Sequence, residues 1–63
     1  MELIKDKRYW CVWAHRYGWY VGAVSKRNWK TGEREIVHQF RDVCDCLIEC
    51  EEQHIEKWVK ENP

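Results

Sequence analysis

The distribution of apolar and polar residues along the first two thirds of the chain predicts three β-strands. Aromatic and β-branched residues are concentrated in residues 7–16, 19–29 and 34–40, and these residue types favour strands. Tyr17-Gly18 separates the first two stretches, and residues 30–33, Lys-Thr-Gly-Glu, separate the second from the third. Because glycine suits a tight turn, the pattern predicts consecutive strands joined by two turns.

From residue 42 onward the pattern becomes that of a helix. At about 100° per residue, one stripe collects the apolar residues Cys44, Leu47, Ile48, Ile55, Trp58 and Val59. Asp42 stands where a helix N-cap is expected. We therefore predict an α+β fold in one domain, residues 1–63. It is a three-stranded antiparallel β-meander over residues 7–40, with one C-terminal helix over residues 42–60 packed on one face (β-β-β-α).

The two turns determine how the strands pair and so divide the side chains between two faces. A turn at Tyr17-Gly18 places Val12 opposite Ala23, and a two-residue turn at Thr31-Gly32 places Ala23 opposite Phe40. Side chains alternate between faces along a strand. The face predicted to form the core under the helix carries Trp10, Val12, Ala14, Trp19, Val21, Ala23, Ile36 and Phe40. The other face carries Tyr9, Cys11, Trp13, His15, Tyr20, Val24, Lys26 and Val37.

The chain has more aromatic residues than a small core needs, nine among 63, so some are expected on the surface. On the face away from the helix, aromatic and basic side chains form a platform, and basic loops flank it. The predicted binding residues are Tyr9, Trp13, His15, Arg16, Tyr20, Lys26, Arg27, Trp29 and Lys30.

Three interpretations of this platform stay open. Its rings could stack on unpaired bases while Lys and Arg contact phosphates. The same face could be buried in a homodimer or against a partner protein, because aromatic residues and Arg are also enriched at protein interfaces. Alternatively, Leu3 and Ile4 could fold back over it.

The net charge is zero, but the basic and acidic residues are concentrated in different halves of the chain. Residues 1–34 carry eight basic and three acidic residues, a balance of +5, and residues 35–63 carry three basic and eight acidic residues, a balance of −5. This asymmetry can mark a basic interaction face. The N-terminal residues include no apolar signal segment, and no run approaches the roughly 20 apolar residues of a membrane span. With four cysteines expected as reduced thiols, we predict a cytoplasmic protein without membrane contact.

The turn and the residues after it resemble the N-terminal arm-binding domain of phage-type integrases, which is AP2-like. Thr31-Gly32-Glu33-Arg34, Phe40 and Asp42 match the turn, the phenylalanine and the helix N-cap of that family. The resemblance covers residues 9–59 and implies a three-stranded sheet that contacts DNA. The third strand of this chain departs from the family because residues 35–39, Glu-Ile-Val-His-Gln, carry no positive charge.

The region predicted as helical also contains metal-ligating and titratable residues. Cys46, Cys50 and His54 would follow one another along a helical stripe, but a single helix cannot close a tetrahedral zinc site. We therefore predict no metal and no cofactor. Glu51 interrupts the apolar stripe, and a contact with His38 would satisfy both side chains. Without a nucleophile or a third orienting group, this contact predicts structure rather than catalysis.

The sequence therefore predicts a non-catalytic accessory or regulatory binding module, of a kind that would suit a phage or mobile element. It would dock on a partner protein, or on a second copy of itself, through the aromatic sheet face. The alternative is a DNA- or single-strand-binding module that uses the same rings and the basic loop 26–34.

Overall fold

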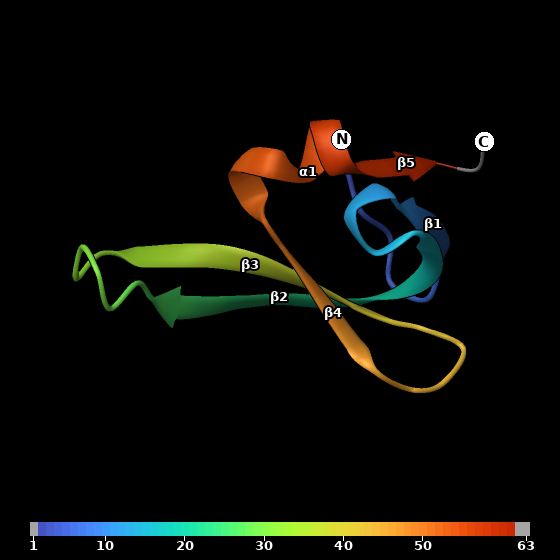
Figure 1. Ribbon diagram of the computed structural model, residues 1–63, viewed down its shortest axis with the longest axis horizontal. Coiled ribbons are helices and arrows are strands. Elements are labelled where there is room, and N and C mark those ends of the chain that lie inside the picture. Colours follow the sequence, from blue (N-terminus) through green and yellow to red (C-terminus); the bar gives the residue numbers. More distant parts are fainter. Residues whose placement is uncertain (1, 62–63) are drawn as a thin grey trace.

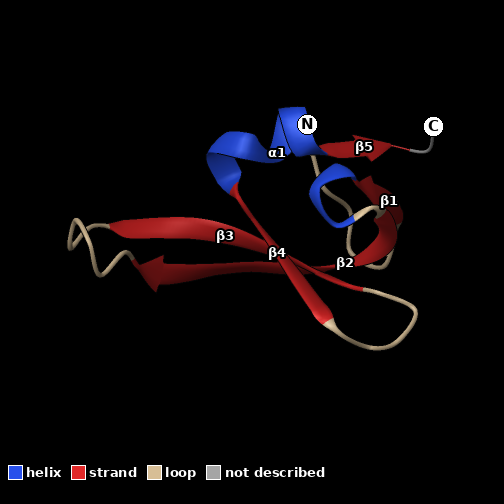
Figure 2. Cartoon of the chain, viewed as in Figure 1, coloured by secondary structure: helices blue, strands red, loops and turns tan. Residues whose placement is uncertain are grey.

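A computed structural model describes residues 2–61 of the chain (Figure 1). The strands are β1 (Arg8–Cys11), β2 (Arg16–Arg27), β3 (Arg34–Arg41), β4 (Leu47–Glu51) and β5 (Val59–Glu61). Helical residues are confined to the single turns η1 (Val12–Ala14) and η2 (Glu52–His54) and to the helix α1 (Ile55–Trp58), as Figure 2 shows. No helix within the described residues is long and apolar enough to cross a membrane.

The five strands form one antiparallel sheet. β1 to β4 are a meander in which each strand pairs with the next, and β5 returns to pair with β1, so that the spatial order is β4-β3-β2-β1-β5. In Figure 1 the β2–β3 hairpin extends away from the rest of the chain, while β1, β5 and α1 gather at its other end. The hairpin and the gathered elements therefore give the molecule two distinct ends.

The core draws one or two residues from every strand and from α1. It consists of Tyr9, Cys11, Tyr20, Phe40, Cys50, Ile55 and Val59, and Leu3, Trp13, Ala14, Ile48 and Trp58 pack against it while staying partly exposed. Side chains from both edge strands meet in this single cluster. The sheet must therefore curl around it, because a flat sheet would keep its edges apart.

Phe40 lies at the centre of the core and is fully buried. Its ring contacts the rings of Tyr9, Tyr20 and Trp13, with centroid separations of 6.0, 5.4 and 6.2 Å. Gly18 faces the same side chain, and a Cβ atom added to it would lie 2.7 Å from Phe40 Cβ. The absence of a side chain at Gly18 thus lets β2 approach Phe40 closely.

The predicted fold class is wrong: a three-stranded meander with a helix over residues 42–60 is not what the chain forms. Residues 47–51 are strand β4, in which Ile48 pairs with Phe40 and Cys50 with His38. The predicted stripe had no apolar position between Ile48 and Ile55, and it is there that β4 ends and the short helical segment formed by η2 and α1 begins. Pairing with β3 and burial of Cys50 outweigh the local helical pattern.

The predicted turn at Tyr17-Gly18 is also wrong. β1 and β2 are joined by η1, after which His15 adopts a left-handed conformation with φ 52°, and Gly18 lies inside β2 opposite Tyr9. The predicted two-residue turn at Thr31-Gly32 is wrong too: residues 28–33 form the loop, and Arg27 rather than Trp29 lies opposite Arg34. A further one-residue shift in the pairing between Tyr20 and Gly22 then places Tyr20, rather than Ala23, opposite Phe40. A shift of one residue exchanges the two faces of a strand.

The shift between Tyr20 and Gly22 alone changes the predicted faces: it places Phe40 on the face of Tyr9, Cys11 and Tyr20, which were predicted on the opposite face. Tyr9, Cys11 and Tyr20, predicted on the open face, are buried with Phe40. Trp10 and Trp19, predicted in the core, are only half-buried, and the ring of Trp10 packs against Tyr17 at 4.9 Å. Phe40 itself lies in the core as predicted.

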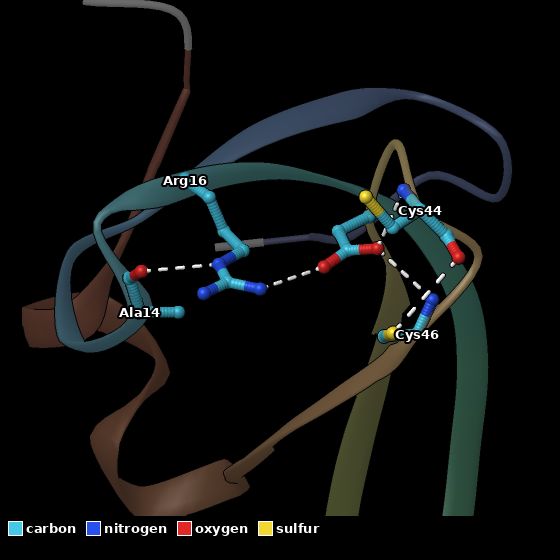
Figure 3. A network of polar contacts seen from close by, with 5 residues as sticks. Ala14, Arg16, Cys44 and Cys46 are labelled. Carbon is cyan, nitrogen blue, oxygen red and sulfur yellow. Dashed lines mark hydrogen bonds and ion pairs between the residues drawn. The ribbon is translucent and has the colours of Figure 1, made fainter.

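The buried Asp42 organises the loop between β3 and β4. Figure 3 shows the network of polar contacts that includes Arg16, Cys44 and Cys46. Asp42 is not a helix cap: its Oδ1 accepts hydrogen bonds from the backbone N–H groups of Cys44 and Cys46, both at 2.9 Å. Arg16 donates to Asp42 Oδ2 at 2.8 Å and to the carbonyl of Ala14 at 3.2 Å. The carboxylate therefore joins this loop to the start of β2, and the hydrogen bonds from Cys46 N–H and Arg16 hold its pKa below the ordinary value.

Substituting Gly18→Ala should destabilise the protein by about 1–3 kcal/mol, because the added methyl group has no room beside Phe40 and Cys11. Urea unfolding followed by tryptophan fluorescence measures the change. Ser25→Ala, at an exposed position of the same strand, should stay within about 0.5 kcal/mol of the wild type. Equal stability of the two variants would contradict the close packing.

Substituting Asp42→Asn should lower the melting temperature at neutral pH and weaken its dependence on acid. Because the pKa of Asp42 is lowered by folding, its stabilisation is present above the unfolded value of about 3.9 and is lost as the pH falls through the native pKa. Asp45→Asn is the matched control, since Asp45 makes an exposed ion pair with Arg41. Melting curves from neutral pH to pH 2 should differ more from wild type for D42N than for D45N; equal effects would contradict this account.

Candidate functional site

A groove of about 530 Å³ runs between the hairpin and the short helical segment. Its apolar lining comes from Trp13 in η1, Val37 in β3 and Trp58 in α1, and Trp29 of the β2–β3 loop stands at its rim. These residues are distant in sequence, and the curl of the sheet brings them together. Three tryptophans, Trp13, Trp29 and Trp58, thus line one open groove.

The charged residues of the groove are mixed in sign. Three are basic (Lys26, Arg27 and Lys30) and three are acidic (Glu35, Glu49 and Glu51). Lys26 Nζ lies 2.6 and 2.9 Å from the two carboxylate oxygens of Glu49, which also accepts from Gln39 at 2.8 Å. The hydrogen bond from Lys26 is the main reason that the pKa of Glu49 is lowered. The charges of Lys26 and Glu49 therefore neutralise each other.

The two other carboxylates of the groove interact with amides instead of cations. Glu35 accepts from Asn28 Nδ2 and Glu51 from Gln53 Nε2, each at 2.9 Å. Neither carboxylate forms an ion pair within residues 2–61, so no cation of the described chain is paired with them.

The hairpin loop presents Trp29 on an ordered backbone. Asn28 N–H donates to the carbonyl of Glu33 at 2.7 Å, and Asn28 Oδ1 accepts from the N–H of Lys30 at 2.9 Å. Gly32, with φ 78°, closes the turn by donating to the carbonyl of Asn28. Trp29 is nevertheless 82% exposed, with Lys30 Nζ 5.7 Å from its ring centroid. An ordered loop that holds a large exposed ring is typical of a contact anchor.

Five of the nine residues predicted from the sequence come together in the groove: Trp13, Lys26, Arg27, Trp29 and Lys30. Tyr9 and Tyr20 lie in the core, 0% and 8% exposed, and cannot stack on a partner. His15 is exposed in the β1–β2 turn, Arg16 forms an ion pair with Asp42, and neither residue lines the groove. The predicted platform is therefore divided between core, turn and groove.

The groove residues that sequence reasoning missed include Glu35 of β3 and, from the segment predicted as helix, Glu49, Glu51 and Trp58. Trp58 was expected in the apolar stripe of that helix; it packs against the core and also lines the groove. Only the pairing of β4 with β3 brings Glu49 and Glu51 to the groove, and no local signal in residues 47–51 announces it.

The N-terminal segment contacts the core through Leu3, whereas Ile4 is 54% exposed. Leu3 packs against the core cluster, and the N–H of Ile4 donates to Tyr9 Oη at 2.8 Å. Burial of Tyr9 thus depends on the segment that precedes β1.

His38 has a partner other than the predicted Glu51. Its Nδ1 is hydrogen-bonded to Tyr20 Oη at 2.8 Å, and its Nε2 lies 3.4 Å from Glu52 Oε1, beside a hollow of about 390 Å³. Burial raises the pKa of the Tyr20 phenol, which therefore keeps its proton and is a poor nucleophile. The three side chains link β2, β3 and η2 as a structural unit.

Two of the four free cysteines are buried and two are exposed. Cys11 and Cys50 are buried, whereas Cys44 and Cys46 are exposed on the β3–β4 loop. Within residues 2–61, no three His, Cys, Asp or Glu side chains are grouped so that they could hold a metal ion.

Comparison of the chain with protein-family models, with curated proteins and with solved structures finds no match. The resemblance to integrase arm-binding domains stays a prediction, although the three-stranded sheet that it implied is replaced by the five-stranded one.

Two thiols should react quickly in the native protein and two slowly. Burial raises the pKa of Cys11 to about 11 and also raises that of Cys50, and a thiol reacts through its thiolate. Intact-mass analysis after brief iodoacetamide treatment at neutral pH should show two adducts, on Cys44 and Cys46, with four after unfolding in guanidinium. Equal labelling of all four native thiols would contradict the burial.

Proposed function

We propose that this chain is a small, non-catalytic, cytoplasmic module that docks a segment of a protein through the tryptophan groove. The observation that carries the proposal is the combination of three groove tryptophans with equal numbers of acidic and basic side chains. Tryptophan and arginine are enriched at the energetic centres of protein interfaces, where a large ring fills a pocket and excludes water.

The charge of the groove favours a protein over a nucleic acid as its occupant. Glu35, Glu49 and Glu51 line it, and Lys26 is already neutralised by Glu49. Phosphate binding needs uncompensated positive charge at the contact, and carboxylates repel phosphates. A protein segment, which can present both signs of charge and apolar side chains, suits this lining better.

A second candidate function rests on the hairpin alone. Arg27 and Arg34 lie opposite each other at the end of the β2–β3 ladder, beside exposed Trp29 and Lys30. Like charges in opposite positions destabilise a ladder unless an anion compensates them. A single-stranded nucleic acid could supply phosphates to these cations and a base to Trp29.

Selection of a random linear peptide library against the protein tests the docking function. We expect enriched peptides whose affinity falls on the order of tenfold or more with Trp29→Ala and with Trp58→Ala. Trp29→Ala cannot act through the core because its side chain is 82% exposed.

Trp19→Ala is the matched control, since Trp19 is half-buried outside the groove, and it should bind the same peptides with unchanged affinity. Failure to enrich any peptide sensitive to the groove variants would overturn the docking function. Titration with single-stranded oligonucleotides at low salt should leave tryptophan fluorescence unchanged. Quenching that weakens steeply with added salt would instead favour the second candidate.

A further inference from the structure

The groove and the hairpin loop lie side by side, and their features are complementary. Trp29 stands at the rim of a groove whose lining includes Trp13 and Trp58. The loop therefore offers one large exposed ring, and the adjacent groove offers an aromatic surface that could receive one. A surface that contains both members of a contact can pair with itself across a two-fold axis.

The charges of this surface are complementary in the same way. Arg27 lies opposite Arg34, and neither forms an ion pair within residues 2–61. Among the same described residues, the Glu51 carboxylate accepts a hydrogen bond only from the amide of Gln53. One molecule thus carries an uncompensated cation on the hairpin side of the groove and an uncompensated carboxylate on the β4 side.

We propose that the occupant of the groove is the hairpin loop of a second copy of this chain, in a two-fold symmetric dimer. Trp29 of each copy enters the groove of the other, and Arg27 of each copy pairs with Glu51 of the other. The inference rests on the proposed docking function of the groove and names a second copy as its partner.

The whole-chain charge permits this association. The net charge is zero, with the basic excess in residues 1–34 and the acidic excess in residues 35–63, so two copies do not repel each other strongly. One groove and one loop from each copy form a small interface. Interfaces below about 1,200 Å² in total area belong to weak, transient complexes, so the dimer should form at high protein concentration.

Sedimentation equilibrium over a wide concentration range tests the proposal on the intact protein. Wild type should shift from monomer to dimer as concentration rises, and Trp29→Ala should weaken dimerisation on the order of tenfold or more. R27E and E51K should each weaken it as well, because each places like charges at both Arg27–Glu51 contacts of the dimer.

Mixing R27E with E51K gives the decisive result. In the mixed dimer the carboxylate introduced at position 27 meets the ammonium introduced at position 51, and the second contact keeps the native Arg27–Glu51 pair. Mixing should therefore restore dimers that neither variant forms alone. K5E, a charge reversal at an exposed lysine outside the groove, should dimerise like wild type.

A wild type that stays monomeric at every concentration would overturn the proposal while leaving peptide docking to be judged by the library selection. Equal dimerisation of all variants would place the contact elsewhere and overturn the proposal. Failure of the mixed variants to form dimers would overturn it as well. Circular dichroism of each variant confirms that a lost dimer does not reflect a lost fold.

Discussion

The contact between Phe40 and Gly18 is the constraint on which the rest of this structure depends. A ring from β3 fills the space left by the missing side chain of β2, and Tyr9 and Tyr20 close around it. The chain is short, so one cluster must serve all five strands. The strands can reach that cluster only if the sheet curls, and the curl brings β5 back beside β1.

The same curl creates the groove. Trp13 follows β1 and Trp58 precedes β5, and both elements are drawn to the core end of the β2–β3 hairpin. The two rings pack against the core with one part and line the groove with another. The aromatic surface is thus continuous with the hydrophobic core, and this continuity stiffens it. These side chains are already ordered in the folded protein. Little further conformational entropy is therefore lost when a partner binds, and this favours binding.

Local residue preferences predicted some elements well and others poorly. The third strand, expected at residues 34–40, is β3 (Arg34–Arg41), because β-branched residues and pairing on both sides agree there. Residues 42–60 were misassigned because their apolar spacing fits a helix, whereas residues 47–51 can also pair as a strand. The neighbouring β3 supplies that pairing, and these residues therefore form β4. Of the candidate site, the loop residues Trp29 and Lys30 could be found from sequence, since a turn rich in polar residues must be exposed. Glu51 could not, because its place in the groove depends on pairing with a strand 14 residues earlier, opposite Val37.

The sequence by itself determined that the chain forms a small domain with a surplus of aromatic residues, a β2–β3 hairpin ending in a basic loop, and Phe40 in the core. Only the tertiary structure decided which rings are buried and which are offered to a partner. The reason is the two-residue period of a strand: the one-residue shift at Val21 places Tyr20, and with it Tyr9, on the face of Phe40 without changing any local preference. Burial then follows from long-range pairing, which a local pattern does not contain.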